Sequence, residues 1–223
     1  IKKRSGSSWS NISGSGISAA ASDYVDVACD KNNLPFVVYR NGGVGNTAIV
    51  KRYNGSSWVD VGSAAITTGS VTDCSIAFNR LNRPNIAYSD GANNNRAAVK
   101  YFDGTNWNWI SLFNGAAYNI VDAVLSPDGT KLYIYDKLNG FIVFNGSYTT
   151  WTQVTLSIPQ LPSNVVPEKL ALVPGNNNKD YNVICGTHPN LDDNAVQNLF
   201  HIYEWKNTYT NPVVKQDPLS FGT

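Results

Sequence analysis

Short stretches in which apolar and polar residues alternate recur along the chain. Cys74–Phe78 alternates large and small side chains, and Pro84–Tyr88 follows after a polar turn. Alternation with a period of two is typical of a half-buried β-strand. Ala97–Phe102 and Trp107–Ile110 continue the pattern, and Asp103-Gly104 between them suits a type I′ hairpin turn, whose two central residues need positive φ. The pattern predicts four short antiparallel strands, and almost no helix.

These strand patterns belong to an internal repeat. Trp9, Trp58 and Trp107 lie 49 residues apart, and Trp151 follows after 44. The residues that lead up to these tryptophans repeat as well: residues 51–58 recur as 100–107 and, more loosely, as 144–151. A period of roughly 40–50 residues with strand-like content is the signature of a propeller or array. We therefore predict an all-β protein, a β-propeller of four-stranded blades.

Aligning the copies predicts one β-propeller domain over residues 1–223, with repeats at about 1–50, 51–99, 100–143 and 144–202 and a tail at 203–223. In the first copy we expect strands near Val25–Cys29, Phe36–Tyr39, Ile49–Tyr53 and Trp58–Val61. The alignment gives four full blades preceded by a half blade, residues 1–12, so the ring is five-bladed or part of a larger one. Natural sheets rarely leave edges open. We therefore expect the inner strands of the half blade to come from missing sequence, from another chain or from the tail, so the sequence is either truncated or self-associates.

Composition narrows the class of ligand and the setting. Only 15 % of residues are charged and the net charge is +1, which argues against nucleic acid, since a phosphate-binding protein needs a basic surplus. No apolar run approaches the roughly 20 residues of a membrane span. Glu occurs only at positions 168 and 204, a composition that favours hairpins over helices and suits a secreted or cell-surface protein. Three cysteines, Cys29, Cys74 and Cys185, cannot all pair, and each lies in a predicted strand, so we expect small buried side chains.

The repeated text resembles the propeller-type repeats of secreted and cell-surface proteins of bacteria. Their loose consensus reads apolar-Lys-Tyr/Phe-Asn/Asp-Gly-Ser/Thr-x-Trp-x-x-Val-Gly, followed by an Ala-rich inner strand and a Pro-x-Val-Ala-Tyr strand. The resemblance covers about residues 1–156 and weakens beyond them. It implies a propeller fold in an extracytoplasmic setting, and it implies no particular activity.

The repeated aromatic residues are candidates for ligand binding. Tyr39, Tyr88 and Tyr135 end the second strand of successive copies, and Asn41 and Asp90 follow two of them. Aromatic faces stack on sugar rings, while amide and carboxylate groups bond to hydroxyls. The alternative is packing, because residues that recur once per blade commonly fill the same gap against the neighbouring blade. For Trp58 and Trp107 we favour packing, in equivalent and largely buried positions between blades.

A cation site is conceivable in the irregular stretch at residues 186–195. His188, Asp192 and Asp193 place three potential ligands within six residues. Carboxylate oxygens suit calcium and imidazole suits zinc, but the spacing matches no standard motif, and a solvated loop is the alternative. The sequence predicts no other cofactor.

Residues suited to catalysis are scarce. A sialidase needs converging arginines and a Glu–Tyr pair, but all six Arg precede residue 97. A glycosidase needs two carboxylates at a set separation, and most Asp here suit turns. We therefore expect a non-enzymatic extracellular binding or adhesion module with a protein or glycan ligand. The first alternative is a carbohydrate-binding lectin, and a glycosidase-type enzyme or accessory domain is the weaker one.

Overall fold

The computed structural model describes residues 1–12, 16–79, 81–112, 120–126, 131–136, 140–147, 150–154, 165–174, 181–189, 199–205 and 213–220. Side-chain surroundings are described for residues 1–12, 16–79, 81–109, 126, 131–134, 142–146 and 151–153.

The described strands form one hairpin and four antiparallel sheets of four strands, which we call blades. The N-terminal hairpin is β1 (Lys2–Ser5) and β2 (Ser8–Asn11). Blade 1 consists of β3 (Ser22–Cys29), β4 (Pro35–Asn41), β5 (Thr47–Tyr53) and β6 (Trp58–Asp60). Blade 2 consists of β7 (Val71–Phe78), β8 (Pro84–Asp90), β9 (Arg96–Phe102) and β10 (Trp107–Leu112). Blade 3 consists of β11 (Ile120–Leu125), β12 (Lys131–Asp136), β13 (Gly140–Ser147) and β14 (Thr150–Val154). Blade 4 consists of β15 (Val165–Pro174), β16 (Tyr181–Pro189), β17 (Leu199–Trp205) and β18 (Val213–Ser220).

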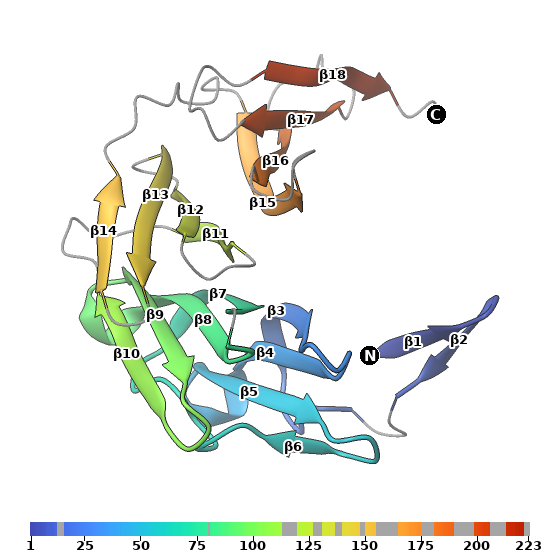
Figure 1. Cartoon of the computed structure of the whole chain (residues 1–223), viewed down its shortest axis with the longest axis vertical. Helices are drawn as coiled ribbons and strands as arrows, with labels where there is room; N and C mark the ends of the chain where they lie inside the picture. Colours follow the sequence, from blue (N-terminus) through green and yellow to red (C-terminus); the bar gives the residue numbers. More distant parts are fainter. Residues whose placement is uncertain are drawn as a thin grey trace.

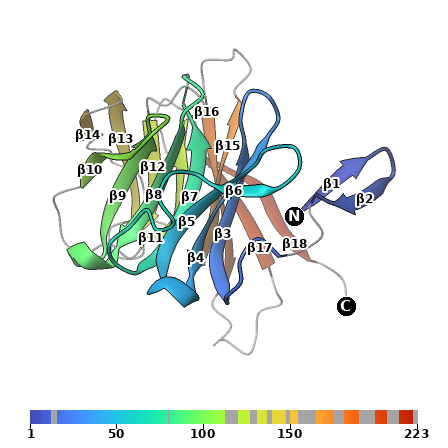
Figure 2. The same ribbon diagram turned by 90° about the horizontal axis from the view of Figure 1, so that it is seen from below.

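The four blades stand around a common centre in an open arc (Figures 1 and 2). Successive innermost strands touch: β3 contacts β7, β7 contacts β11, and β11 contacts β15. The N-terminal hairpin projects beside blade 1, away from the other blades (Figure 1). The only helices in the described part of the chain are two three-residue 3-10 turns, η1 (Gly42–Val44) and η2 (Gly91–Asn93), and none there is long and apolar enough to span a bilayer. The predicted propeller fold is therefore confirmed, including the half blade at the front.

The 49-residue repeat of the sequence is also a repeat of strand register. Val27 faces Val37 in blade 1, and Ile76 faces Ile86 in blade 2, with the same bulge earlier in each inner strand. The outer pairs agree too, because Tyr53 faces Trp58 and Phe102 faces Trp107. Since a slip by one residue would turn every side chain to the other face of its sheet, residues 49 apart in blades 1 and 2 hold equivalent positions and can be compared directly.

The core consists of the layers between blades. Between blades 1 and 2 it includes Val38 and Val50 from one sheet and Ile76, Ile86 and Tyr88 from the other. Between blades 2 and 3, a second cluster joins residues of both sheets: Ala87, Ala97, Val99, Leu132, Ile134, Ile142 and Phe144. Blade 2, which has a described core on each side, therefore buries both faces, which is how short strands with few residues each build a continuous apolar interior.

Trp107 links the outer strands of blades 1 and 2. Its ring packs on the cluster between them, and its Nε1 donates a 2.7 Å hydrogen bond to the carbonyl of Val61. Gly62, with φ of +79°, lies against this ring, and a Cβ there would come within 2.9 Å of it. Trp58 occupies the same position in blade 1, beside Val37, Tyr39 and Ile49. Packing between blades is therefore confirmed for Trp107, whereas Trp58 packs on its own sheet, and both indoles are half-buried instead of largely buried as predicted.

Four expectations need correction. Asp103-Gly104 does join two strands, but only Gly104 has positive φ, because Asp103 caps a longer turn with its carboxylate. Cys29 is exposed, whereas Cys74 is buried as expected; the surroundings of Cys185 lie outside the described side chains. His188 lies in strand β16 instead of an irregular stretch. Residues 203–205 and 213–220, assigned to a tail by the repeat, belong to β17 and β18.

The innermost strands of blades 1 and 2 are joined by one carboxylate. Asp26 accepts hydrogen bonds from Ser75 Oγ at 2.8 Å and from the backbone N–H of Ile76 at 2.9 Å. Asp26→Ala should lower the free energy of unfolding by about 1–3 kcal/mol, because two donors between packed strands lose a charged acceptor. Asp23→Ala is the matched control, because Asp23 forms a solvent-accessible ion pair with Arg40. Loss of that pair should lower the free energy of unfolding by about 1 kcal/mol or less. Equal losses in urea denaturation would contradict this assignment.

Candidate functional site

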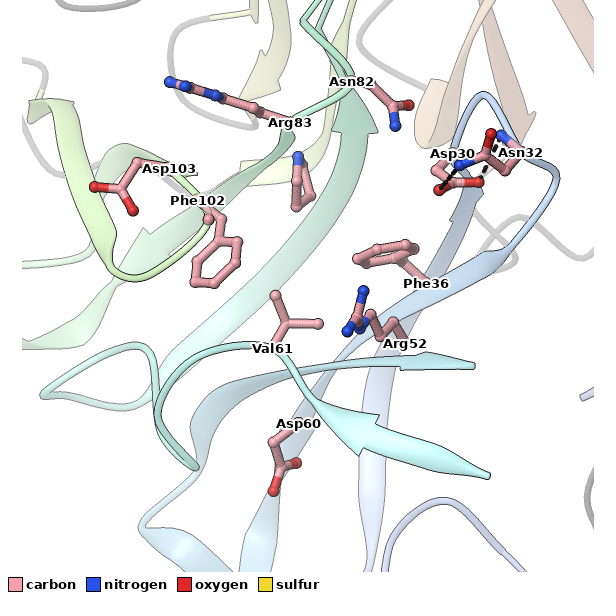
Figure 3. Close-up of a pocket in the computed structure, with 12 residues that line it drawn as sticks. Asp30, Asn32, Phe36, Arg52, Asp60, Val61, Asn82, Arg83, Phe102 and Asp103 are labelled. Atoms are coloured by element: carbon pink, nitrogen blue, oxygen red, sulfur yellow. Dashed lines mark hydrogen bonds between the residues drawn. The ribbon is translucent and has the colours of Figure 1, made fainter. Parts of the chain in front are cut away.

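A hollow of about 400 Å³ lies between blades 1 and 2. Turns and strand ends at one end of the two sheets line it (Figure 3). The lining residues are Asp30, Asn32, Phe36, Arg52, Asp60, Val61, Asn82, Arg83, Pro84, Phe102, Asp103 and Gly104. Its size is that of a small-molecule site, and both blades contribute to it. We call it the inter-blade pocket.

Two equivalent turns hold one wall of the pocket. In the β3–β4 turn, Asp30 Oδ1 accepts from the backbone N–H groups of Asn32 and Leu34, each at 2.8 Å. Asn79 holds the β7–β8 turn in the same way, 49 residues on. The two turns are tied across the blades, because Asn82 Oδ1 accepts from the backbone N–H of Lys31 at 2.8 Å. This wall is therefore fixed by hydrogen bonds before any ligand arrives.

The floor of the pocket is apolar and partly aromatic. Figure 3 shows the rings of Phe36 and Phe102 on either side of Val61. Phe36 packs edge-on against Phe78, with ring centroids 4.9 Å apart, and Phe102 packs against Trp107 at 5.4 Å. Phe102 is half-buried, so part of its surface remains available to a ligand. Aromatic surface held in this way can receive the apolar face of a sugar ring.

Two arginines supply donors around this floor. Arg52 comes from the end of β5 and is exposed, and Arg83 comes from the turn before β8 and is half-buried. The two residues therefore line the pocket from different blades. Each offers several N–H donors in a fixed plane and suits bidentate contacts to carboxylates or vicinal hydroxyls.

The three carboxylates of the pocket already have partners. Asp30 is held in its turn, and Asp60 forms a 2.8 Å ion pair with Lys51, with its carboxylate turned away from the pocket floor (Figure 3). Asp103 accepts from the N–H groups of Asn106 and Thr105 and from Asn108 Nδ2 at 2.7–2.8 Å. These bonds, with a smaller contribution from Arg83, hold the pKa of Asp103 below its usual range. Asp103 is therefore an ionised acceptor at neutral pH.

The tyrosines predicted as ligand contacts lie elsewhere. Tyr39 and Tyr88 are buried at equivalent positions, Tyr39 in the cluster with Trp58 and Tyr88 in the core between blades 1 and 2. Burial raises the pKa of both phenols. Tyr135 lies in β12, and its side chain is outside the described set. In blades 1 and 2 the structure thus gives these residues packing contacts, and ligand binding by the series stays an untested prediction.

Asn41 and Asp90 hold the opposite end of the same sheets. Asn41 Oδ1 accepts from the N–H of Gly43 at 2.9 Å, at the start of η1. Asp90 Oδ1 accepts from the N–H of Ala92 at 3.0 Å, at the start of η2. Both side chains are almost fully buried. Their contacts are those of turn caps, and neither residue lines the inter-blade pocket.

The predicted cation site falls largely outside the described residues. Asp192 and Asp193 lie there, and of His188 only the backbone, in β16, is described. Within the described residues, no group of three His, Cys, Asp or Glu side chains could hold a metal ion. Calcium binding at His188, Asp192 and Asp193 stays a prediction.

Three of the pocket residues break the repeat, so periodicity does not single them out, whereas Phe102 and Asp103 keep it in the repeated Tyr/Phe-Asn/Asp-Gly turn. Phe36 corresponds to Asn85, Arg52 to Tyr101 and Arg83 to Leu34. A lectin with one site per blade would have a set of binding residues present in every copy. The useful signal was the reverse: large or charged residues that depart from the repeat at one end of adjacent blades.

The chain matches no protein-family model and none of the curated proteins. Among solved structures it is similar to an α-L-arabinofuranosidase from Fusarium graminearum in complex with an iminosugar inhibitor, with 13% identity and a TM-score of 0.62 over 86% of this chain and 65% of that one. An N-acetylgalactosamine deacetylase from F. plautii, in complex with blood group B trisaccharide, gives 13% identity and a TM-score of 0.54 over 90% and 73%. An exo-β-1,3-galactanase from Clostridium thermocellum gives 12% identity and a TM-score of 0.56 over 89% of this chain and 48% of that one.

This chain therefore spans just under two thirds of the length of the arabinofuranosidase that it matches. At such identities the similarity is one of fold. The four-stranded antiparallel sheets of this chain match propeller structures, in agreement with the architecture derived above.

Proposed function

We propose that this protein is a carbohydrate-binding β-propeller and that the inter-blade pocket is its glycan site. The observation that carries the proposal is the convergence of exposed aromatic surface from Phe102 with guanidinium donors from Arg52 and Arg83 and an ionised acceptor, Asp103, in one hollow of about 400 Å³. A sugar presents an apolar ring face surrounded by hydroxyls, so it needs this combination of stacking surface, donors and acceptors. The same fold carries the deacetylase that was solved with blood group B trisaccharide, which supports a glycan over a protein ligand.

We propose further that binding occurs without catalysis. A glycosidase acid must hold a proton near neutral pH, which requires a raised carboxyl pKa. Asp103 has a lowered pKa, and Asp30 and Asp60 are engaged in a turn and an ion pair. A binding module of this kind suits a secreted or cell-surface protein, which is the setting that we propose from the composition.

A glycan array probed with the whole chain tests the proposal, followed by calorimetry on the best-bound oligosaccharide. We expect specific binding by the wild type and its loss when the pocket is altered. Binding that persists unchanged in a variant with Arg52 and Arg83 both replaced would show that the glycan site lies elsewhere. Absence of any glycan ligand, with capture of a protein ligand through the same pocket, would replace the glycan proposal.

The pH dependence separates binding from catalysis. The pKa of Asp103 is depressed in the folded protein, so its carboxylate stays charged above that value and its contacts are lost only as the pH falls through it. Glycan affinity should therefore be constant between about pH 5 and 8, well above the ordinary Asp pKa of about 3.9. Calorimetry at several pH values measures this. Release of sugar from the bound oligosaccharide with a bell-shaped pH profile would instead show an enzyme.

A further inference from the structure

The face of blade 1 that points away from blade 2 exposes apolar side chains that the repeat normally buries. Val25 is 58% exposed and Val27 54%, whereas their equivalents in blade 2, Cys74 and Ile76, are each 4% exposed. Cys74 and Ile76 are covered because blade 1 packs on them, with Phe36 and Val38 in the same cluster. The outer part of the blade 1 face, at Val37, Tyr39 and Ile49, is covered by Ile17 and Trp58. The uncovered area is thus the inner half of this face.

A buried hydrogen-bond donor at the rim of this face is left without an acceptor. Trp58 Nε1 is buried and has no hydrogen-bond partner in the described part of the chain. Its equivalent, Trp107 Nε1, donates to the carbonyl of Val61 in the preceding blade. The residue 49 positions before Val61 is Ile12, which immediately follows the N-terminal hairpin. An unpaired buried N–H costs free energy. A backbone carbonyl at the position of Ile12, equivalent to that of Val61, would supply the missing acceptor for Trp58 Nε1.

The N-terminal hairpin has the strand register of an outer blade half. Lys3 faces Ser10 and Arg4 faces Trp9, as Arg52 faces Val59 and Tyr53 faces Trp58 in blade 1. All residues of β1 and β2 are exposed, and Trp9 is 64% exposed. In blade 1, the edge of β5 that is turned away from β6 pairs with β4. The corresponding edge of β1 has no partner strand among the described residues.

We propose that the exposed face of blade 1 and the free edge of β1 together form a docking site for a partner β-hairpin of the same repeat type. The partner's chemistry follows from what covers the equivalent face of blade 2. There β4 presents Phe36 and Val38 to it, β3 adds Ala28, and β4 pairs with the outer strand β5. The docked hairpin therefore adds two antiparallel strands to β1 and β2, completes a four-stranded blade, and covers Val25 and Val27. This is recognition by strand addition, with side-chain pockets setting specificity. It is independent of the glycan site.

The test adds the predicted partner to the full chain. A copy of residues 20–49, which contains β3 and β4, is joined directly ahead of Ile1, where the repeat register places it. Because the new blade buries apolar surface on blade 1, we expect Tm to rise by about 5 °C or more. In ¹⁵N-tryptophan spectra we expect hydrogen exchange at Trp58 Nε1 to slow by about tenfold or more. The control has the same extension with Phe36→Asp and Val38→Asp within the copy, so length and linkage are unchanged.

A rise in Tm and slower Trp58 exchange in the extended chain but not in the control would support the docking site. Equal values for the extended and control chains would overturn it, because packing by the repeat face would then make no difference. Sedimentation of the unextended chain tests the other occupant. A dimer that Val27→Asp separates into monomers would show that a second copy covers this face, and the hairpin partner would be rejected.

Discussion

Replacing Trp107 with alanine should lower the free energy of unfolding by about 3 kcal/mol, the lower end of the range for truncating a large aromatic residue. The indole packs on the core between blades 1 and 2, stacks at a tilt on Phe102 and donates to the carbonyl of Val61. Gly62 lies against it, so on that side there is no side chain that could fill the gap. Urea denaturation followed by circular dichroism measures the loss.

Trp58→Ala is the matched control, because Trp58 holds the equivalent position in blade 1. It packs on a cluster of three buried residues and its Nε1 has no described partner. We therefore expect a smaller loss than for Trp107→Ala, by at least about 1 kcal/mol, the ordinary contribution of one hydrogen bond. Equal losses would show that the hydrogen bond to Val61 does not contribute. If Trp58→Ala kept full stability and abolished glycan binding, Trp58 would have to be reassigned as a ligand contact.

Arg83→Ala should weaken glycan binding by about 10- to 100-fold, since a hydrogen bond from a charged donor contributes about 1.5–3 kcal/mol. Arg83 stands at the rim of the inter-blade pocket, near Asp103 (Figure 3). Arg52→Ala should act in the same direction from the other blade. Isothermal titration with the best-bound oligosaccharide of the array gives the dissociation constants.

Arg4→Ala provides the control for the loss of one positive charge. Arg4 lies on the exposed N-terminal hairpin, where it donates only to the nearby carbonyl of Gly6 among the described residues. Its replacement should leave the glycan dissociation constant unchanged. If Arg4→Ala and Arg83→Ala weakened binding equally, the effect would come from net charge, and the pocket would not be the site.

The blades could be predicted well from the sequence because the same pattern of strands and turns recurs in several copies. Alternation placed β4, β5 and β6 of blade 1 within one or two residues of their observed ends, and the spacing of Trp58 and Trp107 placed the outer pairs. Errors arose where the burial of a residue depends on whether a neighbouring blade covers it. Cys29 is expected to be covered like Phe78, its half-buried equivalent, yet it is exposed because no blade in the described part of the chain covers that side of β3.

The candidate site was harder to predict because it depends on contacts between blades. Arg52 and Arg83 are 31 positions apart in the chain and belong to different sheets, and only the packing of those sheets brings them to one hollow. Periodicity directs attention to residues that recur, such as Tyr39 and Tyr88, and these pack in the cores of blades 1 and 2. Arg52 and Arg83 of the candidate site depart from the repeat, and a single sequence does not separate such departures from neutral variation.

The shared strand register also bears on how such a chain can change during evolution. A duplication or deletion of 49 codons leaves every strand of blades 1 and 2 on its original face, wherever within the repeat the breakpoints fall. A change of one codon within a strand would instead reverse the inside and outside for the rest of that strand. Unequal recombination between copies can therefore add or remove whole blades while the others keep their strand register, and only the layers between blades that flank the change have to repack. The number of blades is then free to vary among descendants of the same gene, while the contents of each pocket change separately by point mutation.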